Sequence, residues 1–208
     1  MSIIVRMKTR DDKVKRILEL VRTSGIVSTG EVRSLGIHHE YLRQLCEEGK
    51  LVRIGRGRYM LYDAKVTVHH GLAQAGKIVP KGAICLLSAL RFHEIGTQAP
   101  YEVWMSIDRR AARPRTMHPR MRIVRFSGKA LSEGINEHII EGVRVRIYNP
   151  AKTVVDCFKY RNKIGLDVAL EALREGIRGR KCTIDEMWHY AKVCRVTKIM
   201  RPYMEAIV

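Results

Sequence analysis

Acidic residues are scarce in this 208-residue sequence relative to basic ones. Lysine and arginine number 39 against 21 aspartates and glutamates, which gives a formal net charge of +18. An excess of this size indicates a polyanionic partner, and nucleic acid is the simplest one. Charge alone indicates no fold, so the fold has to come from the order of the motifs.

The sequence also has few cysteines and no long apolar segment, which argues against several classes of protein. The five cysteines are odd in number and widely spaced, without a C-x-x-C pair, so we expect neither a zinc site nor a disulfide framework. No apolar run approaches the ~20 residues of a membrane span, and the first residues lack the apolar segment of a signal peptide. We therefore expect a cytoplasmic protein with buried, reduced thiols and no membrane partner.

The strongest local pattern lies in the first third of the chain. Ser28 and Glu31 have the spacing of a capping box, so we expect a helix that starts there and ends at Gly36. A tight turn leads to a second helix over His38–Glu48, which Gly49 closes with a left-handed residue. Two helices joined in this way form a helix-turn-helix, whose second helix can enter a DNA major groove.

A hairpin is expected directly after these helices. Strands over Lys50–Ile54 and Arg58–Tyr62 flank a glycine-arginine tip, Gly55–Gly57. An amphipathic helix over Asp11–Thr23 precedes the motif and is expected to pack behind it. The sequence therefore predicts a winged helix-turn-helix domain over residues 1–64.

Polar side chains of this domain are candidate DNA contacts. Arginine and glutamine make bidentate contacts with guanine and adenine edges, while the basic wing would reach phosphates or a minor groove. The candidates are Thr29, Arg33, His38, His39, Arg43, Gln44, Lys50, Arg53, Arg56 and Arg58. Acidic residues on the second helix (Glu40, Glu47, Glu48) weaken this interpretation, and a winged helix that binds protein stays an alternative.

The sequence pattern of residues 65–208 predicts a larger domain that contains both helices and strands. Helices are expected over Ala64–Pro80 and Ala83–Ile95, followed by strands over Tyr101–Ile107 and Met121–Phe126. The segment Gly71–Ile78 almost matches the phosphate-binding loop G-x-x-x-x-G-K-[ST], but isoleucine replaces the hydroxyl residue that holds magnesium. We interpret that match as chance.

The last third predicts a hairpin and then helices. The hairpin turns at Glu141-Gly142, between strands over Ile135–Ile140 and Val143–Tyr148. The expected helices cover Ala151–Arg161, Leu166–Ile177, a segment capped by Thr183 and Glu186, and about Ile199–Ile207. The predicted fold class is α+β: an N-terminal winged helix-turn-helix, then a larger mixed α/β domain with a small sheet and a C-terminal helical portion.

The most polarised stretch runs from Arg109 to Lys129, with eight basic residues and no acidic one. It is either a solvated basic loop or a second anion surface, for nucleic acid or for an acidic protein. Its candidate residues are Arg109, Arg110, Arg113, Arg115, Arg120, Arg122 and Arg125. Residues 66–208 hold 25 basic and 13 acidic residues, so most of the charge excess lies outside the winged helix.

Five motifs occur together in one order. They are Arg56–Tyr59, Leu87–His93, Thr97–Pro100 with Trp104, Val145–Phe158 and Ile164–Leu173. In this order they resemble the AbiEi-type antitoxins of AbiE (type IV) toxin–antitoxin systems. The resemblance implies that the winged helix binds repeats in its own promoter and represses it, and that the larger domain counters a nucleotidyltransferase toxin. Within the best-matching motif, Lys152 and Asp156 are expected to form an internal ion pair.

Two other functions stay open. A nuclease would need carboxylates such as Glu102, Asp108, Glu137 and Glu141 around magnesium, but no D…E-x-K spacing is present. A winged-helix regulator without a toxin partner is the second alternative. The leading hypothesis is a repressor and antitoxin that binds double-stranded DNA, with no catalytic residues, no cofactor and no small-molecule substrate.

Overall fold

The computed structural model describes residues 9–114 and 118–206 of the chain. The chain divides into two compact units. The first unit contains the residues up to His70 together with Glu141–Val143, and the second contains Gly71–Ile140 and Arg144–Val208. The division describes packing, and the functional boundary after residue 64 stays a prediction.

The first unit is a small helical domain with a sheet. Its elements are α1 (Arg10–Ser24), β1 (Val27–Ser28), α2 (Thr29–Ser34), α3 (Glu40–Glu47), β2 (Leu51–Gly55) and β3 (Arg58–Leu61). Thr9 caps α1 by accepting a hydrogen bond from the Asp12 backbone, and Gly25 ends the helix. Apolar side chains of α1, α2, α3 and β2 form one buried cluster, which includes Ile17, Val32 and Leu42. The predicted amphipathic helix and helix-turn-helix are both present.

Local signals set the ends of α2 and α3. The Ser28–Glu31 capping box is present with both of its hydrogen bonds, as predicted. Helix α3 begins at Glu40 rather than at His38, because the His38 ring accepts a hydrogen bond from the Glu40 backbone and holds the preceding residues in the turn. Gly49 has a φ of 69° and follows the helix as predicted.

The wing is one strand wider than the predicted hairpin. Strand β3 lies between β1 and β2, so the sheet has the order β1-β3-β2. The β2–β3 hairpin turns at Arg56 and Gly57, with an irregularity between Arg53 and Gly55. The Thr29 backbone N–H donates to the Gly57 carbonyl at 3.0 Å, which ties the wing turn to the start of α2.

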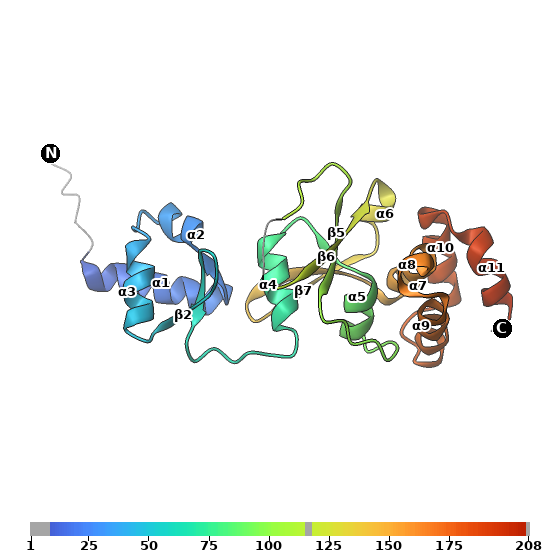
Figure 1. Ribbon diagram of the computed structural model, residues 1–208, viewed down its shortest axis with the longest axis horizontal. Helices are drawn as coiled ribbons and strands as arrows, with labels where there is room; N and C mark the ends of the chain where they lie inside the picture. The colour runs from blue at the N-terminus through green and yellow to red at the C-terminus, as the bar shows by residue number, and fades with distance from the viewer. Residues whose placement is uncertain (1–8, 115–117, 207–208) are drawn as a thin grey trace. The chain divides into compact units, whose positions relative to one another are not determined.

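The second unit is built on a mixed five-stranded sheet (Figure 1). The sheet has the order β6-β5-β4-β8-β7, with β5 parallel to β6, β4 parallel to β8, and β4 antiparallel to β5. Its strands are β4 (Ala83–Ile84), β5 (Val103–Asp108), β6 (Met121–Phe126), β7 (Ile135–Ile140) and β8 (Val143–Tyr148). Helix α4 (His70–Ile78) precedes these strands, and α5 (Leu86–Phe92) and α6 (Lys129–Ser132) lie between them in the sequence.

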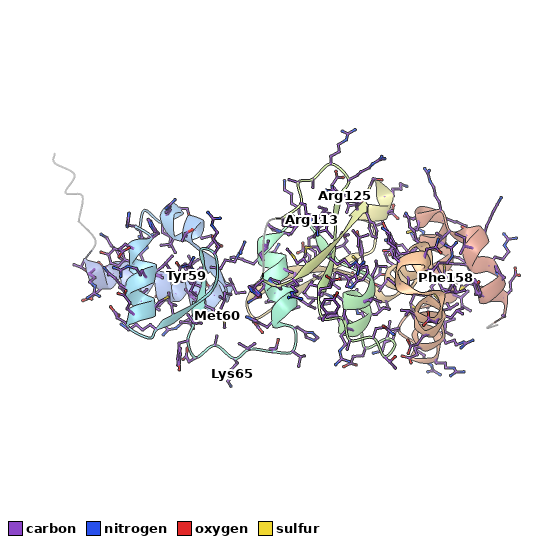
Figure 2. The ribbon with its side chains drawn as sticks, viewed as in Figure 1. Tyr59, Met60, Lys65, Arg113, Arg125 and Phe158 are labelled. Atoms are coloured by element: carbon purple, nitrogen blue, oxygen red, sulfur yellow. The ribbon has the colours of Figure 1, made fainter. Side chains whose placement is uncertain are left out.

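A helical group completes this unit. It contains α7 (Pro150–Lys159), α8 (Arg161–Ile164), α9 (Leu166–Arg178), α10 (Ile184–Cys194) and α11 (Thr197–Glu205). Asn149 caps α7 with proline in the first turn, and Thr183 with Glu186 forms the predicted second capping box. Helix α7 is buried along most of its length, and Phe158, labelled in Figure 2, lies in the main core cluster.

Two predicted helices were wrong in part. The helix expected over Ala64–Pro80 exists only from His70 to Ile78, because the preceding apolar residues are solvent-exposed and contribute little packing: Val68 is 94% exposed. The helix expected over Ala83–Ile95 begins only at Leu86, since the first two residues form the central strand β4. A short strand buried on both faces has no alternating pattern that separates it from a helix.

Smaller corrections concern other ends. Strand β5 starts at Val103 and is buried on both faces, whereas Tyr101 is 81% exposed. The near match to a phosphate-binding loop lies inside helix α4, where Gly76 packs against Val145, so no such loop exists there. The last helix starts at Thr197, earlier than predicted, and the predicted end at Ile207 lies outside the described residues.

Candidate nucleic-acid interface

The second helix of the motif, α3, presents an arginine held between two glutamates. The Nε of Arg43 donates to Oε1 of Glu40 at 2.6 Å, and the same guanidinium pairs with Glu47 one turn further on. These hydrogen bonds lower the pKa of Glu40 and raise that of Arg43. Arg43 therefore has to exchange a carboxylate for a base edge before it can read DNA. Residues three and four apart on a helix lie side by side, so the spacing of Glu40, Arg43 and Glu47 in the sequence is the signal for this pairing.

The turn before α3 holds a second polar group. The Arg33 Nη2 lies 3.3 Å from the Nδ1 of His39, and the His38 and His39 rings lie 4.4 Å apart. Arg33 and His38 are exposed, while His39 is half-buried. The structure thus brings three of the predicted candidates together at the start of α3.

The Lys50 ammonium is already neutralised. Its Nζ lies 2.8 Å from Glu48, and the same carboxylate binds Arg10 at 2.6 Å. An exposed pair of this kind is weak, so it can open, but Lys50 starts with its charge paired. Gln44 is half-buried on α3. Thr29 lies against the wing, because a Cβ at Gly57 would be 3.1 Å from its hydroxyl.

Among the candidate DNA contacts, the wing arginines are the most available cations. Arg56 sits exposed in the hairpin turn, and among the described residues it makes no ion pair. The Nε of Arg53 donates to the Gly55 carbonyl at 3.2 Å, which leaves the rest of its guanidinium exposed. Arg58 is half-buried, and burial lowers the pKa of its guanidinium. Strand, turn and strand thus present three arginines at one edge of the unit.

The helix-turn-helix and its basic wing form the part of the chain that resembles a known protein family. Residues 15–62 match the family model of the AbiEi antitoxin transcriptional regulators. The match runs from within α1 to the residue after β3, and it leaves the second unit uncovered. The AbiEi match supports a role in transcription regulation and DNA binding, and an antitoxin role with it.

The fold of most of the chain has a counterpart among solved structures. The crystal structure of the Rv2827c protein from Mycobacterium tuberculosis superposes with a TM-score of 0.58 at 10% sequence identity. The similarity covers 86% of this chain and 71% of that one. At this identity the likeness concerns the fold alone. No curated protein matches the sequence.

The basic stretch between β5 and β6 is anchored by one of its own arginines. The Nη1 of Arg125 donates to the backbone carbonyls of Asp108, Arg109 and Ala111, at 3.3, 2.7 and 2.9 Å. Because β5 and β6 are parallel neighbours, the connection between them is a crossing that returns from the end of β5 to the start of β6. Arg125, labelled with Arg113 in Figure 2, holds the start of that crossing and is therefore structural as well as cationic.

A second arginine of the stretch also has partners. The Nη1 of Arg122 donates to Glu102 at 3.2 Å, and its guanidinium lies 4.7 Å from the centre of the Trp104 ring. Four other candidates are exposed: Arg109, Arg110, Arg113 and Arg120. Arg115 lies outside the described residues. The exposed four, rather than the whole set, are the available part of this surface.

The predicted internal ion pair is confirmed. The Nζ of Lys152 lies 2.5 Å from Oδ2 of Asp156 on α7, and both side chains are fully buried. Lys152 also lies 4.2 Å from the Tyr148 ring centre, and the Cys194 thiol donates to Asp156 at 3.4 Å. Burial raises the pKa of Asp156 in spite of the lysine beside it. The pair sits in the core and faces no solvent, so it is structural.

The carboxylates that a nuclease would need serve other contacts. Glu102 binds Arg122, Asp108 accepts a hydrogen bond from the Arg110 backbone, and Glu137 pairs with Arg144 at 3.4 Å. Glu141, within the first unit, accepts from Thr67 and pairs with His70. In residues 9–114 and 118–206 no group of three His, Cys, Asp or Glu side chains is placed to hold a metal ion. No helix of the described chain has the length and apolarity for a bilayer crossing.

Proposed function

We propose that this protein is a DNA-binding repressor of its own promoter and an antitoxin against a nucleotidyltransferase toxin. The observation that carries the proposal is the basic wing on an AbiEi-type helix-turn-helix. Phosphate contacts by cations supply most of the affinity of such domains, and Arg56 is both exposed and free of ion pairs with described residues. The α3 helix carries the base-reading role, with Arg43 and Gln44 as its contacts.

The four exposed arginines of the second unit form part of this proposal. We define the loop arginines as Arg109, Arg110, Arg113 and Arg120. They give the second unit a cationic surface of its own, and they serve DNA affinity without reading sequence. The toxin is countered by the second unit.

Two measurements, one of DNA binding and one of growth rescue, test the two halves of the proposal. The full chain is titrated onto DNA from upstream of its own gene and onto a scrambled duplex of equal length, at physiological salt. Specific binding of the upstream DNA, together with rescue of growth when an adjacent nucleotidyltransferase is induced, is the expected result. Upstream binding without rescue would leave a regulator with no toxin partner. Equal affinity for both duplexes would contradict the repressor assignment.

A further inference from the structure

The second unit contains a pocket of about 600 Å³ that the DNA-binding proposal does not use. It lies where β6, α6, the end of α7 and the end of α10 meet. Four basic side chains line it, together with a hydroxyl and a thiol: Lys129, Lys159, Lys192, Arg195, Ser127 and Cys194. The described residues that line it include no carboxylate. The volume is in the range of pockets that hold small ligands.

The cations of the pocket are not neutralised by the protein. Among the described residues, Lys159, Lys192 and Arg195 form no ion pair. Lys129 lies 3.8 Å from Glu133, but its side chain is 83% exposed, so that pair is weak. Four like charges gathered in one concavity repel one another, and an anion bound among them removes that cost.

The floor of the pocket offers no counter-charge either. Cys194 is buried there, and its thiol donates to Asp156. The charge of that carboxylate is already balanced by Lys152 at 2.5 Å. The same contacts fix α10 against α7, and His189 on α10 lies 3.3 Å from Glu133 beyond the end of α6. The cations are therefore carried on elements that pack firmly together.

Arg195 occupies a backbone position that favours glycine. It follows α10 with φ 59° and ψ 41°, in the left-handed region. A non-glycine residue there costs stability. Arg180 has the same feature, with a φ of 51°, but it does not line the pocket. This second arginine provides a matched control.

We propose that this pocket binds a small, multiply phosphorylated molecule. Several phosphate groups would meet the four cations at once, with the Ser127 hydroxyl as an additional donor. Duplex DNA fits the pocket poorly, because its phosphates lie on a convex cylinder and reach only the rim of a concavity. The proposal goes beyond the DNA-binding function and does not depend on it.

The test measures the binding of inorganic tripolyphosphate to the full chain by isothermal titration calorimetry at physiological salt. We expect one saturable site per chain. Arg195→Gly should weaken binding roughly tenfold, as expected for loss of one charge-assisted contact, and should leave the melting temperature unchanged or raised. Arg180→Gly makes the same change of charge and backbone outside the pocket, and should bind tripolyphosphate like the wild type.

Two further arms identify the ligand class. If ATP binds more tightly than tripolyphosphate, and this binding is lost in the Lys159→Gln/Lys192→Gln variant, the result would support the proposal and indicate an additional contact with the nucleoside. Equal binding of ATP and tripolyphosphate would support recognition of the phosphates alone. The proposal is overturned if the wild type shows no saturable site, or if Arg195→Gly and Arg180→Gly bind alike. It is also overturned if the pocket variants weaken duplex DNA binding and not tripolyphosphate binding.

Discussion

At the scale of residues, ion pairs decide which charges are available. Arg43 is the residue type that reads guanine, yet two glutamates of its own helix hold it. The wing arginine Arg56 has no such partner among the described residues. Residue type alone therefore favours α3 as the element that contacts DNA bases. The ion pairs of Arg43 and the lack of one at Arg56 favour the wing as the source of DNA affinity.

Glu47→Gln should strengthen DNA binding. The substitution removes a negative charge from the face of α3 and releases one side of Arg43, so we expect affinity to rise roughly two- to fivefold at low salt. Fluorescence anisotropy with upstream DNA measures the change. Glu19→Gln, on α1, removes the same charge without touching Arg43, and an equal gain from it would assign the effect to net charge alone.

The buried pair on α7 makes a second residue-scale prediction. Lys152→Met leaves Asp156 buried without its cation, which should cost about 3–5 kcal/mol of unfolding free energy. Urea denaturation measures the loss. The double variant Lys152→Met/Asp156→Leu should recover most of it, because neither charge is then left alone.

The loss in Lys152→Met should also depend on pH. Burial already raises the folded-state pKa of Asp156, and removal of the lysine raises it further. The folded state then binds the proton more readily than the unfolded state, so stability is regained as the pH falls. We expect the deficit to be smaller at pH 5 than at pH 8. A deficit that grows at low pH would contradict this account of the pair.

At the scale of elements, the two units use the same capping device. Ser28 with Glu31 starts α2, and Thr183 with Glu186 starts α10. Since α2 also anchors the wing turn through Thr29, the first box supports the candidate DNA surface as well as the fold.

Removing each cap should separate stability from binding. Ser28→Ala and Thr183→Ala should each cost about 1 kcal/mol, measured by urea denaturation. We expect weaker DNA binding from Ser28→Ala only, because its helix start holds the wing. Equal affinity for the two variants would indicate that the wing position does not depend on this cap.

Elements with strong local signals could be predicted from the sequence, and those set by long-range pairing could not. Helix α1, the capping boxes and the Glu141-Gly142 turn all carry their own signals, and the structure contains them. Strand β1 has two residues and exists only because β3 pairs with it. Strand β4 takes its partners from β5 and β8, far along the chain, and so looked like part of a helix.

The candidate site followed the same division. The sequence shows where the basic residues occur along the chain, but the groups that each one contacts depend on the fold. The carbonyl contacts of Arg125 join strand β6 to residues well before it in the sequence. The pocket around Lys192 and Arg195 was missed because its lysines come from three helices, with no motif to connect them.

At the scale of the whole molecule, both units contribute to a net charge of +18. Arg122 and Arg125 bind other groups of the protein through their guanidinium groups, whereas the side chains of the loop arginines are exposed and form no ion pair with the described residues, so their charge can act outward. The Arg113→Gln/Arg120→Gln variant should bind the upstream and the scrambled duplex more weakly by the same factor, with no change in the melting temperature of the protein. Arg125→Gln, by contrast, should lower stability. If the double variant weakens the upstream duplex alone, the loop reads sequence.

The central claim is that the wing delivers this protein to DNA through phosphate contacts. Its most direct test is the salt dependence of upstream DNA binding for the wild type and for Arg56→Ala/Arg58→Ala, with folding of the variant verified by circular dichroism. We expect the variant to bind more weakly, and the slope of log affinity against log salt to shrink by about 2, near one for each lost phosphate contact. An unchanged affinity with an unchanged slope would contradict the account.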